Sequence, residues 1–160
     1  MKEKMKILVA LKLVESADEL MERAMKVASR YDARIYLLHV LHDMPHLSFY
    51  YDVYQLWEEF RDKAMKETIK QMNVYIEKLS EKFKDVEPLV AVGEPYEAIL
   101  DEAERLDVDL IIIGNQGLTG LAKMLHNNVG EKVITLSKRP VLSFAIGKRA
   151  EERRVGKECR

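Results

Sequence analysis

Five short apolar runs, separated by segments with helical periodicity, constrain the fold of this chain more than any other feature. Each run is rich in Ile, Leu and Val and nearly continuous, as is typical of strands buried on both faces of a parallel sheet. The expected strands span residues 6–11, 33–41, 86–92, 108–113 and 140–146. Pro140 opens the last of them, at a position where a strand tolerates a missing N–H.

Apolar residues recur at helical spacing between these runs. The expected helices span residues 16–31, 55–83, 96–106 and 129–137. Ser16 and Glu19 have the spacing of a capping box, and Pro95 suits a first helical turn. This alternation predicts an α/β fold with a five-stranded parallel sheet and helices on both faces, in which a ligand binds where the strand order reverses.

Charge and composition exclude several kinds of protein. A formal net charge of −1, with 33% charged residues, gives no basic excess of the kind that nucleic-acid binders carry. No apolar run approaches the roughly 20 residues that a membrane-spanning helix needs. The charged segment 1–5 lacks the pattern of a signal peptide. We therefore expect a cytoplasmic protein with no nucleic acid and no membrane among its partners.

The C-terminal segment differs in character from the rest of the chain. Residues 151–160 match the in-frame translation of a widely used sequencing adapter, so we expect them to be an artefact of the reading frame. An ordinary charged, disordered tail is the alternative. We expect one domain over residues 1–147 and a disordered tail at 148–160, which holds the only cysteine, Cys159.

A glycine-punctuated segment after the fourth expected strand carries a family resemblance. Gly114 and Gly117 are followed by nine residues, then by Asn127 and Asn128, a short helical segment and a strand that begins at Pro140. This order resembles the C-terminal half of the universal stress protein family. The family pattern is Gly, two residues, Gly, nine residues, Gly, and then Ser or Thr.

The resemblance extends over residues 5–146. It implies a Rossmann-like sheet of the adenine nucleotide alpha hydrolase type and a small regulatory protein of the stress response. It also implies a homodimer formed along residues 141–146, between Val141 and Ile146. No nucleophile elbow, zinc-protease or P-loop motif occurs, so we expect no enzymatic activity. An enzyme on the same architecture, such as a nucleotidyl transferase, is a less favoured reading.

Two departures from the family pattern fall on positions that contact nucleotide in ATP-binding members. Asn127 and Asn128 replace the Gly and the Ser or Thr, and Lys12 replaces an Asp that follows the first strand. The resemblance implies a site for ATP or a related adenine nucleotide, with Mg²⁺ only as a companion of the nucleotide. The residues of this site would be Lys12, Val40, Gly114, Gly117, Asn127, Asn128 and Val129.

Two readings of this altered loop remain open. Asn is the non-glycine residue that best tolerates left-handed backbone, and Asn128 with Glu131 repeats the capping-box spacing. The loop could thus keep its path and hold ATP as a nucleotide-gated switch. In the other reading, the added side chains lie where phosphate would approach, and the loop is now structural. The sequence favours weakened or lost binding.

Histidines and aromatic residues provide two further candidates. His39, His42 and His46 lie close together around the end of the second strand. Without cysteines or a fixed ligand spacing, we expect ordinary strand-end and loop residues rather than a metal site. The aromatic segment between Phe49 and Trp57 is expected to pack as core beneath its loop, to bind a protein partner, or both.

Overall fold

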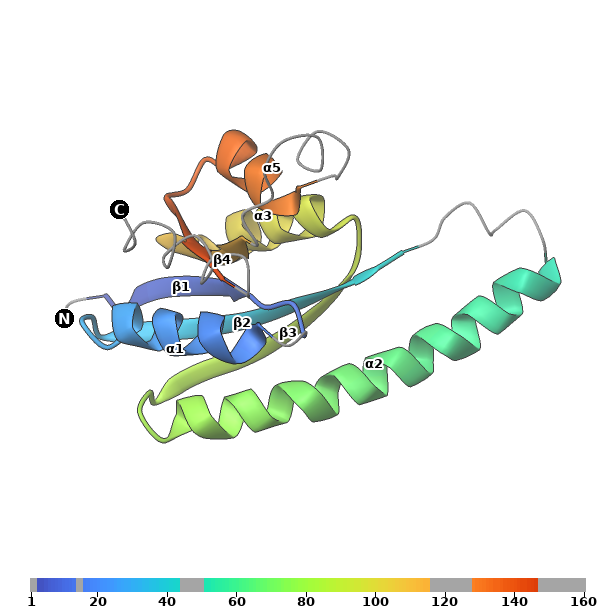
Figure 1. The fold of residues 1–160 in the computed structure, drawn as a ribbon, viewed down its shortest axis with the longest axis horizontal. Helices are drawn as coiled ribbons and strands as arrows, with labels where there is room; N and C mark the ends of the chain where they lie inside the picture. Colours follow the sequence, from blue (N-terminus) through green and yellow to red (C-terminus); the bar gives the residue numbers. More distant parts are fainter. Residues whose placement is uncertain (1–2, 14–15, 44–50, 116–127, 147–160) are drawn as a thin grey trace, which may run out of the picture.

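The computed structural model describes residues 3–13, 16–43, 51–115 and 128–146. Predictions that concern Gly117, Asn127, His46, Phe49 or the segment 148–160 lie outside these residues. Within them, one sheet is covered by helices on both of its faces (Figure 1). Among the described helices, none is both long and apolar enough to cross a bilayer.

The sheet has five parallel strands in the order β3-β2-β1-β4-β5. The strands are β1 (Met5–Ala10), β2 (Ala33–His42), β3 (Asp85–Gly93), β4 (Leu110–Asn115) and β5 (Val141–Ala145). The fold class predicted from the sequence is confirmed, and most strand ends differ from the expected ones by one or two residues. Pro88 lies in β3, an edge strand, where the missing N–H is tolerated.

The helices divide between the two faces of the sheet. They are α1 (Ala17–Ala28), α2 (Tyr51–Ser80), α3 (Pro95–Leu106) and α5 (Val129–Leu136). Ile7 of β1 belongs to the core cluster that contains α1 and α2 residues, whereas Leu8 belongs to the cluster that contains α3 and α5 residues. Successive strand side chains point to opposite faces, so a continuous apolar strand supplies both clusters.

Two local expectations are wrong. Ser16 precedes α1, but its side chain makes no capping hydrogen bond, because its backbone (φ −84°, ψ 1°) is not extended as a capping residue requires. Glu19 instead pairs with Arg23, at 2.9 Å. The expected helix over residues 55–83 also begins too late. Helix α2 begins at Tyr51 and ends at Ser80, so Val53 and Tyr54 of the aromatic segment are helical.

Helix α2 is longer than the sheet that it covers. Thr68, Met72 and Leu79, in its second half, are buried, and Met72 and Leu79 belong to the core. The first half extends past the sheet (Figure 1). At 1.5 Å per residue, the whole helix is about 45 Å long.

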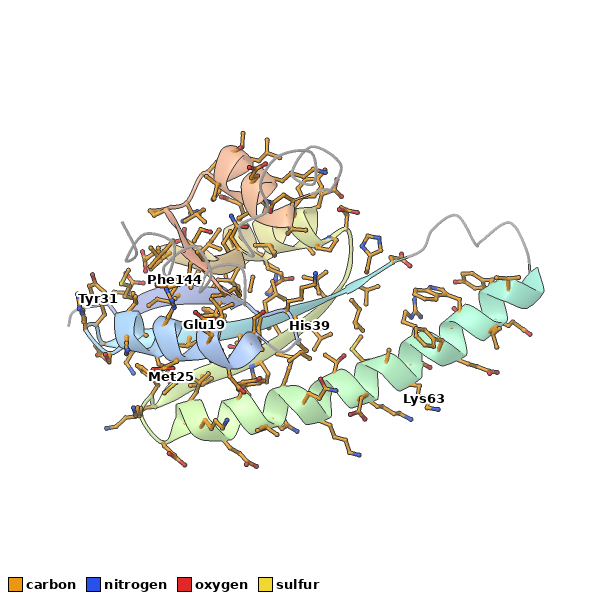
Figure 2. The ribbon with its side chains drawn as sticks, viewed as in Figure 1. Glu19, Met25, Tyr31, His39, Lys63 and Phe144 are labelled. Carbon is orange, nitrogen blue, oxygen red and sulfur yellow. The ribbon has the colours of Figure 1, made fainter. Side chains whose placement is uncertain are left out.

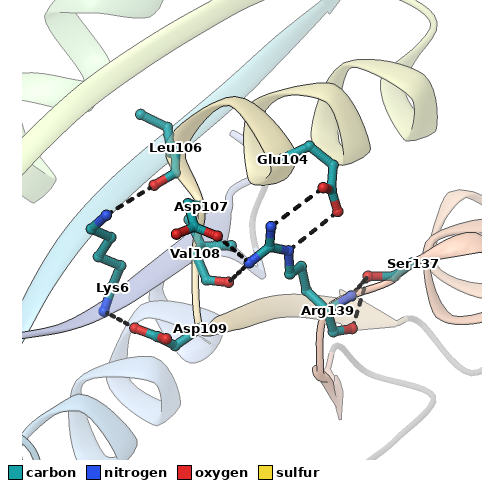
Figure 3. Close-up of polar contacts among 8 residues, drawn as sticks. All are labelled: Lys6, Glu104, Leu106, Asp107, Val108, Asp109, Ser137 and Arg139. Atoms are coloured by element: carbon teal, nitrogen blue, oxygen red, sulfur yellow. Dashed lines mark hydrogen bonds and ion pairs between the residues drawn. The ribbon is translucent and has the colours of Figure 1, made fainter.

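A polar network around Arg139 joins α3 to the start of β5, at the amino ends of the strands (Figure 3). The guanidinium donates to Glu104 at 3.2 Å, to Asp107 at 2.6 Å and to the Val108 carbonyl at 3.2 Å. Hydrogen bonds from Arg139 hold the pKa values of both carboxyl groups below their usual range. This network lies at the end of the sheet away from the site described next.

Candidate functional site

A cavity of about 300 Å³ opens at the carboxyl ends of the strands, where β1 and β4 lie side by side. The chain continues outward from β1 through β2 and β3 on one side, and through β4 and β5 on the other. The connection that follows β1 therefore leads to one side of the sheet, and the connection that follows β4 leads to the other. The gap between these two connections is the crevice in which open α/β sheets bind ligands. Its size lies at the lower end of the range for small-molecule sites.

Five of the seven residues predicted to contact nucleotide line this cavity. They are Lys12, Val40, Gly114, Asn128 and Val129. They come from the ends of β1, β2 and β4 and from the start of α5, so residues far apart in the sequence meet at one edge of the sheet. The other two, Gly117 and Asn127, lie outside the described residues.

Asn128 caps helix α5, as its spacing from Glu131 predicts. Its backbone is extended (φ −75°, ψ 100°), and its Oδ1 accepts a hydrogen bond from the Glu131 N–H at 3.4 Å. The N-terminus of α5 borders the cavity, because Asn128, Val129 and Gly130 all line it. A helix N-terminus attracts anions through its free N–H groups, and here the Asn128 carboxamide already uses one of them.

Lys12 is the charged side chain that β1 delivers to the cavity. It is exposed at the end of the strand and lines the opening. Among the residues that the structure describes, no carboxylate forms an ion pair with it. The cavity therefore combines one lysine with the positive end of a helix dipole, an arrangement that favours an anionic ligand.

Gly114 has a packing role that the motif did not reveal. A Cβ at this position would overlap the buried Ile146 Cδ1 and lie 3.1 Å from its Cγ1 and 3.4 Å from Leu20 Cδ2. Glycine therefore lets Ile146 and α1 pack closely where β4 leaves the sheet. Because Gly114 also lines the cavity, this packing helps to shape the site.

His39 lines the cavity, a role that the sequence did not assign to it. Its Nδ1 lies 2.9 Å from the Leu11 carbonyl oxygen, which can only accept, so Nδ1 carries the proton and donates. The contact ties the end of β2 to the residue after β1. Figure 2 marks the position of His39 on β2. His42 points elsewhere, with Nδ1 4.0 Å from Glu94. No group of three His, Cys, Asp or Glu among the described residues could hold a metal ion.

Several other cavity residues carry no motif and were missed. They include Ala10, Leu11, Leu38, Pro95, Ile99, Gly130 and Ile146. The only sequence signal for them is position: most follow or end a strand, or begin a helix, at the carboxyl edge of the sheet. Most are apolar, so the lining of the cavity is largely apolar, with a few polar residues such as Lys12 and Asn128.

An open parallel sheet with a cavity at its switch point, bordered by a lysine and a capped helix N-terminus, is an arrangement in which α/β proteins bind small anionic or phosphorylated ligands. The family model described as "Universal stress protein family" matches residues 4–144. The chain belongs to the universal stress protein family.

Proteins of similar sequence support this family assignment. The chain is 31% identical over 142 residues to universal stress protein YxiE of Bacillus subtilis, covering 86% of this chain and 96% of that one. It is 33% identical over 144 residues to universal stress protein A homolog 2 of Coxiella burnetii, covering 88% and 94%.

Solved structures share the fold. The structure of MJ0577, a universal stress protein of Methanocaldococcus jannaschii, superposes with a TM-score of 0.72 at 29% identity, covering 89% of this chain and 96% of that one. A universal stress protein in complex with cAMP superposes at 0.60, covering 90% and 98%. A family member from Arabidopsis thaliana with AMP bound superposes at 0.61, covering 89% and 92%. These last two are 21% identical to this chain and show the shared fold alone.

Proposed function

We propose that this chain is a cytoplasmic regulatory protein of the stress response whose cavity binds an adenine nucleotide without turning it over. The adenosine part supplies most of the affinity, and the terminal phosphates add comparatively little. The observation that carries this proposal is the Asn128 side chain, which occupies a helix N–H that a phosphate would otherwise use.

The cavity supports the adenosine part of the proposal. Leu38, Ile99 and Ile113 give it an apolar lining that suits a purine and a ribose. Val40, near the end of β2, also lines the cavity, and backbone groups there can recognise the edge of a base. The AMP bound to one protein of the same fold makes AMP the first nucleotide to test.

The start of α5 supports the phosphate part. An anion at this N-terminus must compete with Asn128 Oδ1 for the Glu131 N–H. A charge-assisted hydrogen bond contributes about 1.5–3 kcal/mol, so losing one removes roughly a tenfold to hundredfold gain in affinity. Lys12 partly offsets this loss, because it lines the same cavity and its amine can approach a phosphate there.

Calorimetric titration of adenosine, AMP and Mg²⁺–ATP tests the proposal. We expect ATP to bind at most about tenfold more tightly than AMP. Asn128→Gly frees the helix N–H at a cost of only a few tenths of a kcal/mol in capping, so it should tighten ATP more than AMP. Asn128→Ser is the matched control, because it keeps a side-chain acceptor and should change the ATP-to-AMP ratio little. A wild-type preference for ATP of a hundredfold or more, or no binding of any of the three, contradicts the proposal.

We also propose that the protein forms a homodimer along residues 141–146. Strand β5 is the edge of the described sheet, and its outer backbone groups are available for a second strand.

A nucleotide-gated switch is a second candidate function, and the position of Ile146 favours it. Ile146 lines the cavity and directly follows the edge strand, and its N–H donates to the Asn115 carbonyl at 2.9 Å. A dimerisation constant that changes on addition of AMP or ATP would support this second candidate.

A further inference from the structure

The residue that follows β1 is held to the end of β2 by two hydrogen bonds. The Leu11 N–H donates to the Leu38 carbonyl at 2.8 Å, and the Leu11 carbonyl accepts from His39 Nδ1 at 2.9 Å. The paired register of the two strands ends just before, at Ala10 and Leu38. The imidazole of His39 therefore holds the chain at the point where the backbone pairing stops.

Leu11 is also anchored by its side chain. Side chains alternate along a strand, and Ile35 and Leu37 of β2 belong to the core cluster that contains α1 and α2 residues, so His39 lies on the same face of the sheet. Leu11 belongs to that cluster and is 2% exposed. The core thus fixes its side chain, and β2 fixes both of its backbone polar groups.

The position of the next residue, Lys12, depends on this anchor. The Lys12 side chain lines the cavity and, within the described part of the chain, forms no ion pair with a carboxylate. A lysine without such a partner has a flexible stem, which loses up to about 2 kcal/mol of rotamer entropy when it is ordered. The backbone at Leu11 is then the main restraint on where the amine can reach.

We propose that His39 is a positioning residue of the cavity: its Nδ1–H holds the Leu11 carbonyl and so directs Lys12 toward the anionic part of the ligand. This role rests on the proposed function, which supplies the ligand, an adenine nucleotide. His39 acts here through the backbone and not by touching the ligand. Because the ring also lines the cavity, a direct contact through Nε2 is the alternative to be separated by experiment.

The hydrogen bond to Leu11 determines the tautomer of His39. A carbonyl oxygen only accepts, so Nδ1 keeps its proton, and in the neutral ring Nε2 is left as an acceptor. We expect nitrogen-15 chemical shifts of the free protein at about pH 8 to show the proton on Nδ1. The chain has four histidines, and the signals that disappear in His39→Asn are those of His39. A proton on Nε2 would overturn the proposal.

Two substitutions separate the two ring nitrogens. The short Asn amide places its N–H near the position of Nδ1, so His39→Asn keeps a donor to Leu11 and removes Nε2. The longer Gln amide places its N–H near the position of Nε2, so His39→Gln removes the bond to Leu11 and keeps a polar group further out. His42→Gln is the matched control, because His42 also lies at the end of β2 but has its Nδ1 4.0 Å from Glu94.

Calorimetric titration of AMP and of adenosine isolates the effect on the phosphate. His39→Gln should weaken AMP about threefold to tenfold relative to adenosine, because a displaced amine loses part of a charge-assisted hydrogen bond. His39→Asn should restore most of the wild-type ratio, and His42→Gln should not change it. In a Lys12→Met background, His39→Gln should no longer alter the ratio, since the two residues act through one contact. If His39→Asn weakens AMP as much as His39→Gln does, or if the effect persists without Lys12, the ring acts directly and the proposal is wrong.

A second measurement needs no ligand. Nuclear magnetic relaxation should give the Lys12 amide an order parameter of about 0.85 in wild type and in His39→Asn, and a clearly lower one in His39→Gln. Wild type that binds neither AMP nor adenosine contradicts the proposed function, whereas a lower order parameter in His39→Gln still supports the positioning of Lys12. An unchanged order parameter in that variant overturns the positioning role, whichever nucleotides bind.

Discussion

Gly114 lies near the end of β4, where it lines the cavity and lies next to the Ile146 side chain. The motif suggests that this glycine lets a phosphate approach the backbone. The structure adds a different reason, since a methyl group here overlaps a buried isoleucine. One residue can thus serve ligand binding and core packing together.

Gly114→Ala separates these two roles. We expect it to destabilise the protein by about 1–3 kcal/mol, as overpacking does. The overlapping atom is the end of the Ile146 side chain, so Ile146→Val removes it. Urea unfolding of both single variants and the double variant should show that Gly114→Ala costs less in the Ile146→Val background. Equal costs in the two backgrounds would mean that Ile146 is not the obstacle.

Arg139 is a second residue whose role depends on the fold. Its partners Glu104 and Asp107 come from the end of α3, and hydrogen bonds from Arg139 lower the pKa of each. Carboxyl groups with a lowered pKa in the folded protein add stability above their unfolded pKa values of about 4, and this stability is lost as the pH falls.

We expect Arg139→Met to be less stable than wild type at pH 7, and this difference to shrink as the pH falls below about 4. Thermal unfolding at pH values from 3 to 7 measures it, with Lys4→Met as a comparison. Lys4 lowers the pKa of Asp85 in the same direction at another place, so that variant should show a similar window. A stability difference that stays constant over the whole range would rule out this linkage.

Helix α2 shows how one element can have two different environments. Its second half is held by the core through Met72 and Leu79, whereas its first half has exposed apolar side chains. Each half of α2 is about 15 residues long, and an isolated helix of that length is only marginally stable in water. Packing against the core therefore decides how stable each half of the helix is.

We expect amide hydrogens of residues 54–63 to exchange much faster than those of residues 70–79, because the first half opens without unfolding the core. Hydrogen exchange read by mass spectrometry at low protein concentration measures this difference. Equal protection of both halves at low concentration would contradict the expectation.

At the scale of the whole molecule, the free edge of β5 determines how copies can join the sheet. Ile146 N–H donates to Asn115 of β4, and N–H direction alternates along a strand. The N–H groups of Val141, Ser143 and Ala145 therefore point toward the outer edge. A second β5 strand would use these groups.

Ser143→Pro removes one outward N–H and adds a ring at the edge, while leaving the bonds to β4 intact. We expect it to abolish the proposed β5 dimer with little loss of helix or sheet signal in circular dichroism. Light scattering after gel filtration measures the mass, with Ser143→Ala as the control that keeps the N–H. A Ser143→Pro variant that remains folded and dimeric would exclude β5 as the interface.

The sequence by itself determined the order of the strands and helices that the structure describes, because near-continuous apolar strands and amphipathic helices have distinct periods. It also determined the N-cap at Asn128, which depends on residues three positions apart. These are local properties, and local spacing is what a sequence displays.

Tertiary structure alone decided the rest. It decided that Ser16 does not cap α1, that His39 and Ile146 reach the cavity, and that half of α2 lies beyond the sheet. Each of these depends on where the ends of distant strands meet or stop. The cavity residues are mostly apolar positions without a motif, and only the strand order β3-β2-β1-β4-β5 brings them together at one edge.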